Sequence, residues 1–280
     1  METKKYKVAI LYLAIGRYSV FWKGFYQSSE KYFLENHNKT YFVFTDDTNI
    51  EYEGNENVNR VHQDLIKYPY ATLMRYNIFN KIKDILSSYD YIYFFNANMR
   101  FVDHVGEEVF PNDENQGLVM AQHPGFIHNT PDEYAYDRNP GSLAYIPFGA
   151  GKYYFQGCLN GGRSKEYLEL INRLDNAINK DLEKNILALW LDESYLNKYL
   201  LDKNPLILPP NYLYPEGWDL PEYKNNIKIV QIDKSNPRWG GLEYLKNVSE
   251  HNSIQPISRC KLKSVVRRCI VWLKMKLRIS

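Results

Sequence analysis

Apolar residues follow two patterns along this 280-residue chain. Continuous apolar runs, typical of strands buried on both faces of a sheet, occur at Lys7–Ala14, Tyr41–Thr45 and Tyr91–Phe95. Apolar residues at helical spacing predict helices at Phe21–Leu34, Leu73–Leu86, Lys165–Ile178 and Glu183–Leu201. Because strands alternate with helices, the pattern predicts an α/β fold with a mixed, mainly parallel sheet flanked by helices.

The rest of the chain has weaker patterns. Residues 122–162 are rich in Gly, Pro, Asn and Tyr, which predicts a region dominated by loops. Because such a region is too long for a simple connection, we expect it to have a function. Farther along, the proline-rich Pro205–Pro221 should be extended, and Ile227–Ile232 predicts a short strand.

The ends of the three apolar runs are where this fold would place a ligand. In a mainly parallel sheet, ligands bind beyond the carboxyl ends of the strands. These ends lie at Ala14, Thr45 and Phe95, and the last is followed directly by Asn96-Ala97-Asn98. Taken alone, the triplet could be an ordinary turn at the end of a strand, because Asn favours turns.

Charge is distributed unevenly along the chain. The formal net charge is +2, but residues 259–280 carry eight cations and no acid, which leaves −6 on residues 1–258. Apolar residues of this tail share one helical stripe: Leu262, Val265, Val266, Cys269, Ile270, Leu273 and Leu277. The tail therefore predicts a basic amphipathic C-terminal helix on an anionic membrane surface. A helix docked on the body and a disordered tail are the alternatives.

The cysteines and the N-terminus indicate a compartment. Cys158, Cys260 and Cys269 form an odd, sparse set, which argues against a disulfide framework and favours a reducing compartment. The charged N-terminus leads directly into a short strand and has the features of neither a signal peptide nor a membrane anchor. We therefore expect a cytoplasmic protein whose tail contacts the inner membrane peripherally, and no nucleic-acid partner.

Several segments, in order from about Val8 to Arg238, resemble one family. They include AIGRY, YFVFTD, FFNANMRFVDHVG, HPGF, YYFQGCLNGG and WLDESYLNKYLL. The family is the retaining glycosyltransferases of blood-group A and B synthesis and the α1,3-galactosyltransferases, family 6. The resemblance implies a GT-A fold, which we assign to residues 1–245 as the catalytic domain, with a linker and basic tail at 246–280. The vertebrate members begin with a transmembrane anchor, and the N-terminus of this sequence does not have the features of one. We therefore expect this chain to resemble a bacterial cytoplasmic relative.

The resemblance also implies the substrates. The donor is UDP-GalNAc or UDP-Gal, and the acceptor ends in a galactose that is often fucosylated. By alignment, Ala14, Ile15 and Tyr18 match the uridine-binding turn, in which Tyr18 can stack on uracil. Another aligned stretch, Gln156-Gly157-Cys158, selects the donor. A small residue there admits the acetamido group of GalNAc, so Cys158, small to medium in size, favours GalNAc without deciding the question.

The triplet Asn96-Ala97-Asn98 departs from the family. Most members hold Mn²⁺ there with Asp-x-Asp, because hard cations prefer carboxylate oxygens. Neutral amides are poor ligands, although they can donate hydrogen bonds to a sugar or a phosphate. We therefore expect metal-independent catalysis without a cofactor. Cations should supply the missing charge: Lys234 and Arg238 first, with Arg75 on the donor sugar or phosphate.

The remaining expectations concern the acidic pair Asp192 and Glu193 and the residues on the acceptor side. A DE pair on a helix is usually a solvated face, but this pair lies in a matched segment. By resemblance, Glu193 lies under the anomeric carbon as the nucleophile or as the carboxylate that stabilises an oxocarbenium-like transition state. Asp192 should bond donor sugar hydroxyls. On the acceptor side, Trp190 and Glu193 should contact the acceptor sugar, and His123 should bond a hydroxyl of its galactose.

These expectations define a retaining α-1,3-glycosyltransferase. One alternative is a nucleotide-sugar- or carbohydrate-binding module that lost its activity along with its metal site. A pure binding module, however, has no need of a carboxylate such as Glu193 at the reacting face. A second alternative is a hydrolase, which would need two carboxylates about 5–5.5 Å apart, whereas the sequence offers one well-placed candidate.

Overall fold

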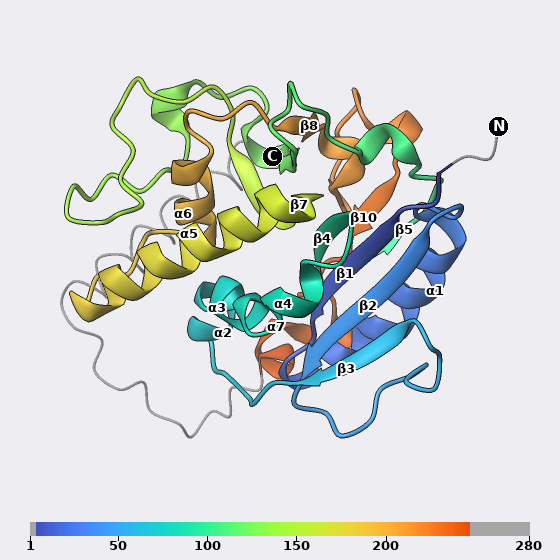
Figure 1. The fold of residues 1–280 in the computed structure, drawn as a ribbon. Helices are drawn as coiled ribbons and strands as arrows, with labels where there is room; N and C mark the ends of the chain where they lie inside the picture. Colours follow the sequence, from blue (N-terminus) through green and yellow to red (C-terminus); the bar gives the residue numbers. More distant parts are fainter. Residues whose placement is uncertain (1–3, 247–280) are drawn as a thin grey trace.

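The computed structural model describes residues 4–246, which form an α/β fold around a seven-stranded sheet (Figure 1). The strand order is β3-β2-β1-β4-β7-β6-β8. Their bounds are β1 Lys7–Leu13, β2 Asn38–Thr45, β3 Val58–His62, β4 Tyr91–Asn96, β6 Leu118–Gln122, β7 Phe155–Arg163 and β8 Leu206–Leu208. Neighbouring strands pair in parallel except where β7 runs antiparallel to both β4 and β6. The predicted mixed, mainly parallel sheet is confirmed.

A second, three-stranded sheet lies beyond the end of β4. It consists of β5 (Met99–Phe101), β10 (Ile229–Gln231) and β9 (Tyr214–Pro215), in the order β5-β10-β9. Because β5 follows β4 after a two-residue turn, this sheet brings the segment after β10 back to the end of β4. Val230, for example, pairs with Arg100, although the two are 230 − 100 = 130 positions apart in the sequence.

Strand β1 illustrates why the apolar runs form central strands. Val8, Ile10 and Tyr12 belong to one core cluster, while Ala9 and Leu11 belong to the other, and all five are fully buried. This alternation follows from the two-residue period of a strand. Helix α1 (Trp22–Tyr32) covers the first face and α5 (Ser164–Glu183) the second (Figure 1). Burial of each large apolar side chain contributes about 1.5–3 kcal/mol.

Two predicted helices differ from the structure. Leu73–Leu86 is not one helix, because α2 (Tyr70–Leu73), α3 (Arg75–Asn80) and α4 (Lys83–Leu86) are separated by residues with non-helical backbone at Met74 and Ile82. Glu183–Leu201 is likewise wrong as a single helix. Helix α5 ends at Glu183, and α6 (Asp192–Tyr199) begins only after an irregular segment.

Backbone bonding explains the second difference. The N–H of Ile186 donates to Asp181 O at 2.7 Å, while Asn185 adopts φ 57°, a left-handed conformation that ends α5. The loop prediction for residues 122–162 is partly wrong as well, because β7 begins at Phe155.

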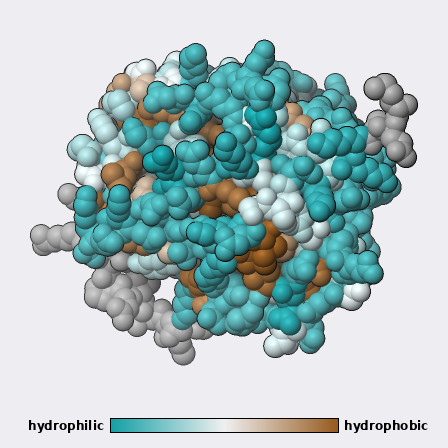
Figure 2. Space-filling view, in the orientation of Figure 1, coloured by the Kyte–Doolittle hydropathy of each residue, from teal (hydrophilic) through white to brown (hydrophobic). Residues whose placement is uncertain are grey.

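The surface on the face seen in Figure 2 is mostly hydrophilic, with a hydrophobic patch near the middle of the view. Among residues 4–246, no helix is long and apolar enough to span a membrane. The last described helix is α7 (Gly241–Leu245). Apart from Lys246, the predicted linker and amphipathic tail lie outside the described residues.

Candidate active site

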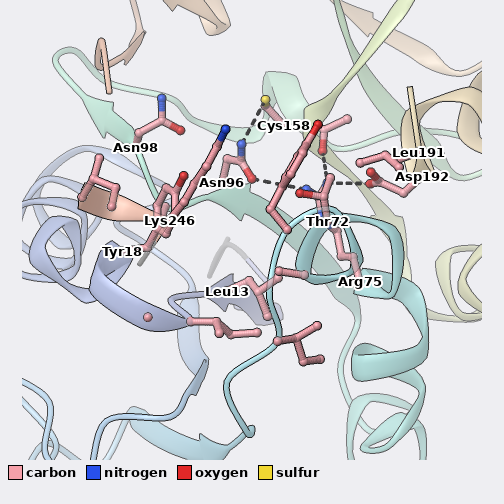
Figure 3. A pocket seen from close by; sticks show the side chains of 18 of the residues that line it. Leu13, Tyr18, Thr72, Arg75, Asn96, Asn98, Cys158, Leu191, Asp192 and Lys246 are labelled. Carbon is pink, nitrogen blue, oxygen red and sulfur yellow. Dashed lines mark hydrogen bonds and ion pairs between the residues drawn. The ribbon is translucent and has the colours of Figure 1, made fainter. Parts of the chain in front are cut away.

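A cavity of about 300 Å³ opens at the carboxyl ends of β1 and β4 (Figure 3). Its wall holds most of the residues singled out in the sequence: Ile15, Tyr18, Arg75, Asn96, Ala97, Asn98, Gly157, Cys158, Trp190, Asp192, Glu193 and Lys234. Four other predicted residues, Ala14, His123, Gln156 and Arg238, do not line it. The fold therefore places its ligand space where a mainly parallel sheet is expected to have it.

The turn after β1 forms one side of the cavity. Gly16 there has φ 65°, a left-handed conformation that glycine adopts without steric cost. Its N–H donates to Asp46 Oδ1 at 2.6 Å, so the ends of β1 and β2 are tied together. Next to it, Tyr18 is half-buried, and burial raises the pKa of its phenol to about 12. Lys234 Nζ lies 5.6 Å from the centre of the Tyr18 ring.

Arg75 joins three elements at the back of the cavity. It is buried, at 5% exposure, and its Nη1 donates to Gly157 O at 2.5 Å and lies 3.0 Å from Asp192 Oδ2. Its Nη2 donates to Asn96 Oδ1 at 3.4 Å (Figure 3). One guanidinium therefore fixes the end of β4, the start of β7 and the start of α6 relative to one another, as its planar fork of donors allows.

Both carboxylates lie in the first turn of α6, and their pKa values are raised. Burial raises the pKa of Asp192 to about 6, although Arg75 opposes the shift. For Glu193, burial raises the pKa to about 7, opposed by hydrogen bonds from the Gly157 N–H and the Tyr154 hydroxyl. Two carboxyl groups that titrate near neutrality in one cavity are typical of a catalytic site.

The residue before α6 has a strained backbone. Leu191 is buried and lines the cavity, and its φ of 57° with ψ of −131° is unfavourable for a branched side chain. Such a conformation costs about 1–3 kcal/mol and persists only where the surrounding structure imposes it. Here it turns the chain abruptly, so that Asp192 and Glu193 both reach the cavity.

The triplet Asn96-Ala97-Asn98 lies at the end of β4. Asn96 Nδ2 donates to Cys158 Sγ at 3.2 Å, and Asn98 Nδ2 donates to Ile232 O at 2.7 Å. The Oδ1 atom of Asn98 is buried without a hydrogen-bond partner among the described residues. Two amides already engaged in these bonds do not fit the preference of a hard cation for carboxylate oxygens. Residues 4–246 contain no group of three or more His, Cys, Asp or Glu side chains arranged to hold a metal.

The cations differ from the expected set. Lys234 lines the cavity, and burial lowers the pKa of its ammonium. Arg238 instead donates to both carboxylate oxygens of Glu216, at 2.6 and 2.7 Å, on the exposed side of the same loop. The second lysine of the cavity is Lys246, whose Nζ lies 4.6 Å from the Tyr68 ring centre. Lys246 was not predicted from the sequence, because no local pattern shows that the chain returns to the cavity after α7.

Cys158 is a buried thiol at the cavity wall. Besides the bond from Asn96, its Sγ accepts one from Gln231 Nε2 at 3.1 Å, and burial raises its pKa to about 11. The thiol is therefore protonated at neutral pH. Its neighbour Gly157 lines the cavity, whereas the Oε1 atom of Gln156 is buried and without a partner among the described residues.

His123 lies behind the cavity rather than in its wall. Its Nδ1 accepts a hydrogen bond from Gly125 N at 3.0 Å, and its ring packs against Tyr154 at 5.6 Å. Burial lowers the pKa of His123 to about 4, so the ring is neutral. Trp190 does line the cavity, and it packs against the same aromatic cluster as Tyr154.

Comparisons with known proteins identify the family. The model of glycosyltransferase family 6 matches residues 1–238. The O-antigen biosynthesis glycosyltransferase WbnI of Escherichia coli is 32% identical over 234 residues, which cover 84% of this chain and 97% of that protein. The histo-blood group ABO system transferase 2 of Rattus norvegicus is 29% identical, and the match covers 81% of this chain and 70% of that protein. The globoside alpha-1,3-N-acetylgalactosaminyltransferase 1 of Gallus gallus is 26% identical, and the match covers 81% of this chain and 67% of that protein. The chain therefore belongs to glycosyltransferase family 6.

Proposed function

We propose that this enzyme transfers GalNAc, or Gal, from a UDP-sugar in an α-1,3 linkage, with retention and without a divalent metal. The acceptor ends in a galactose, which is fucosylated in the preferred substrate. One observation carries the proposal: the carboxylate of Glu193 is fixed in the cavity wall by hydrogen bonds at 2.7 and 2.8 Å. Similarity to a relative named as an alpha-1,3-N-acetylgalactosaminyltransferase supports the linkage and the GalNAc donor.

Glu193 supplies the chemistry at the sugar. In a retaining transfer, a carboxylate on the face opposite the leaving group acts as the nucleophile or stabilises positive charge at the anomeric carbon. A pKa of about 7 leaves a substantial fraction of Glu193 ionised at neutral pH. The same carboxylate argues against the alternative of an inactive binding module, since binding alone does not require a charge held there.

Lys234 and Lys246 balance the charge of the departing UDP. Negative charge develops on the diphosphate as the glycosidic bond breaks, and positioned cations stabilise it. Both lysines line the cavity. Lys246 Nζ lies 3.9 Å from Glu243 Oε1, which is a long distance for an ion pair. The amides of Asn96 and Asn98 add no negative charge beside the diphosphate. We assign Arg238 no direct contact with it.

The remaining residues of the site, most of them in the cavity wall, bind or support the sugars and the base. Tyr18 offers its ring to uracil, and Asp192, held by Arg75, accepts hydrogen bonds from donor sugar hydroxyls. Cys158 limits the space at the donor sugar, and its size favours GalNAc over Gal. Trp190 presents an aromatic face to the acceptor. His123 acts through the packing of Tyr154.

A transfer assay tests the proposal. UDP-GalNAc and UDP-Gal are each offered with lactose and with 2′-fucosyllactose, in EDTA and in Mn²⁺. We expect transfer in EDTA, faster from UDP-GalNAc and faster to 2′-fucosyllactose. Activity only with Mn²⁺ would contradict metal independence. UDP binding without transfer to either acceptor would favour the binding module.

We also propose that the basic tail contacts an anionic membrane surface. Its eight cations and apolar stripe support this, and the tail lies outside the described residues. A chain ending at residue 258 should retain transfer in solution but lose sedimentation with vesicles of anionic lipid. Equal sedimentation of both chains would refute the contact.

A further inference from the structure

The carboxylate of Glu193 is held from both sides by one segment of the chain. The Tyr154 hydroxyl donates to Oε1 at 2.7 Å, and the Gly157 N–H donates to Oε2 at 2.8 Å. One turn further along α6, Asn197 bonds both backbone groups of Phe155, at 2.9 Å each. The start of α6 and the start of β7 are therefore clamped together, and within residues 4–246 the hydroxyl on this carboxylate comes from Tyr154.

Tyr154 is itself rigidly placed. Its side chain is 2% exposed, and its ring packs 4.5 Å from Phe126, 5.5 Å from Tyr136 and 5.6 Å from His123, measured between ring centres. Burial and the nearby charge of Glu193 raise the pKa of the phenol well above its usual value. The hydroxyl therefore keeps its proton and remains a donor at neutral and alkaline pH.

We propose that Tyr154 is a positioning residue that directs the Glu193 carboxylate toward the donor sugar and keeps it in the charged form. This inference rests on the catalytic role proposed for Glu193. A hydroxyl that donates to a carboxylate stabilises the ionised state. That stabilisation opposes the burial that favours the protonated acid. Without it, a smaller fraction of the enzyme would hold Glu193 in the ionised form at neutral pH.

Other charged or titratable groups also act on Glu193. Asp192, Tyr76 and Cys158 interact with it electrostatically, and so does Arg75, which favours the ionised form. None of these contacts is changed by removing only the hydroxyl of Tyr154. The effect of that removal on titration can therefore be read separately.

The test compares Tyr154→Phe with Tyr136→Phe. Both substitutions keep the ring in the same aromatic cluster and remove one hydroxyl. The Tyr136 hydroxyl donates to Tyr153 O at 2.6 Å and not to Glu193, so this variant is the matched control. Turnover at saturating donor and acceptor is measured from pH 5 to pH 9, and UDP affinity is measured by calorimetry.

For Tyr154→Phe, we expect the acid limb of the turnover profile to move up by about one pH unit, with UDP affinity unchanged. For Tyr136→Phe, the limb should stay in place. Each profile is normalised within one variant, so a loss of folded protein that is equal at every pH lowers the profile without moving its limb. An acid limb that stays in place for Tyr154→Phe, whatever the loss of turnover, or the same shift in Tyr136→Phe, would overturn the inference.

Glu193→Gln, measured alongside, separates this inference from the proposed function. If Glu193→Gln keeps full turnover, the proposed role of Glu193 fails, and the inference fails with it. If Glu193→Gln is inactive but the limb of Tyr154→Phe does not move, only the role of Tyr154 is refuted.

Discussion

Arg75 and Asp192 form a buried ion pair, 3.0 Å between Nη1 and Oδ2, with side chains 6% and 2% exposed. The pair joins the start of α3 to the start of α6, where Asp192 directly precedes Glu193 in the sequence. Removing one partner of a buried pair leaves an uncompensated charge, which is far more costly than losing a pair in water.

Arg75→Ala should therefore lower the free energy of unfolding by about 3–5 kcal/mol. Denaturant unfolding monitored by circular dichroism measures it. The matched control is Arg173→Ala, because Arg173 pairs with Glu169 at 3.7 Å on an exposed helix face. That change should cost about 0–1 kcal/mol. Similar losses in the two variants would show that the Arg75–Asp192 pair does not support the fold.

Lys234 and Lys246, rather than Arg238, should determine UDP affinity. Each lysine substituted by Ala should weaken UDP binding on the order of tenfold or more, since a hydrogen bond to a charged group contributes about 1.5–3 kcal/mol. The weakening should diminish as salt rises. Arg238→Ala loses an exposed ion pair with Glu216 and should change affinity only a few-fold. Calorimetry with UDP decides the order, and a dominant effect of Arg238 would contradict this placement of charge.

Glu193 should reduce stability as pH rises. Its folded pKa of about 7 lies above the usual value of 4.5, so the folded state binds the proton more tightly than the unfolded state does. Stability from this group is therefore present at low pH and lost as pH rises from about 4.5 through 7. As the pH rises from 5 to 8, the free energy of unfolding of Glu193→Gln should increase by about 1–3 kcal/mol relative to that of the native chain. A stability difference that does not change with pH would mean that the pKa of Glu193 is not raised.

The two amides of the Asn96-Ala97-Asn98 triplet should respond differently to a negative charge. Asn98→Asp replaces the donor to Ile232 O with an acceptor, which should cost about 1–3 kcal/mol of stability. Asn96→Asp places its carboxylate beside Arg75 and should cost less. Transfer in EDTA should fall in both variants, since each adds negative charge near the diphosphate. A gain of Mn²⁺-driven transfer in the double variant would show that the site retains metal-binding geometry.

The apolar pattern predicted the centre of the fold but not all of it. Strands β1, β2 and β4 are buried on both faces and therefore appear in the sequence as continuous apolar runs. Strand β7 has no such run, because close packing demands glycine: a Cβ on Gly161 would lie 2.5 Å from Ile92 O. Hydrophobic periodicity detects strands through the apolar side chains that fill a core, so it does not detect a strand in which glycines replace those side chains.

The candidate site was predictable to the extent that it lies on matched local segments. The triplet after β4 and the pair Asp192-Glu193 were placed from such segments, and they meet in one cavity. Arg238 was predicted to contact the donor, but its ion pair with Glu216 is a tertiary contact that no local pattern shows, and Lys246 was not predicted at all. Tyr154 was missed for the same reason, since its bond to Glu193 spans 39 residues and follows no local spacing.

The anomeric configuration of the product shows whether Glu193 supports transfer with retention and without a metal. Proton NMR is recorded while UDP-GalNAc and 2′-fucosyllactose react in EDTA, with Glu193→Gln run in parallel. We expect an α-linked product, and in Glu193→Gln a loss of turnover by orders of magnitude with UDP binding retained. A β-linked product, or undiminished turnover in Glu193→Gln, would contradict this expectation.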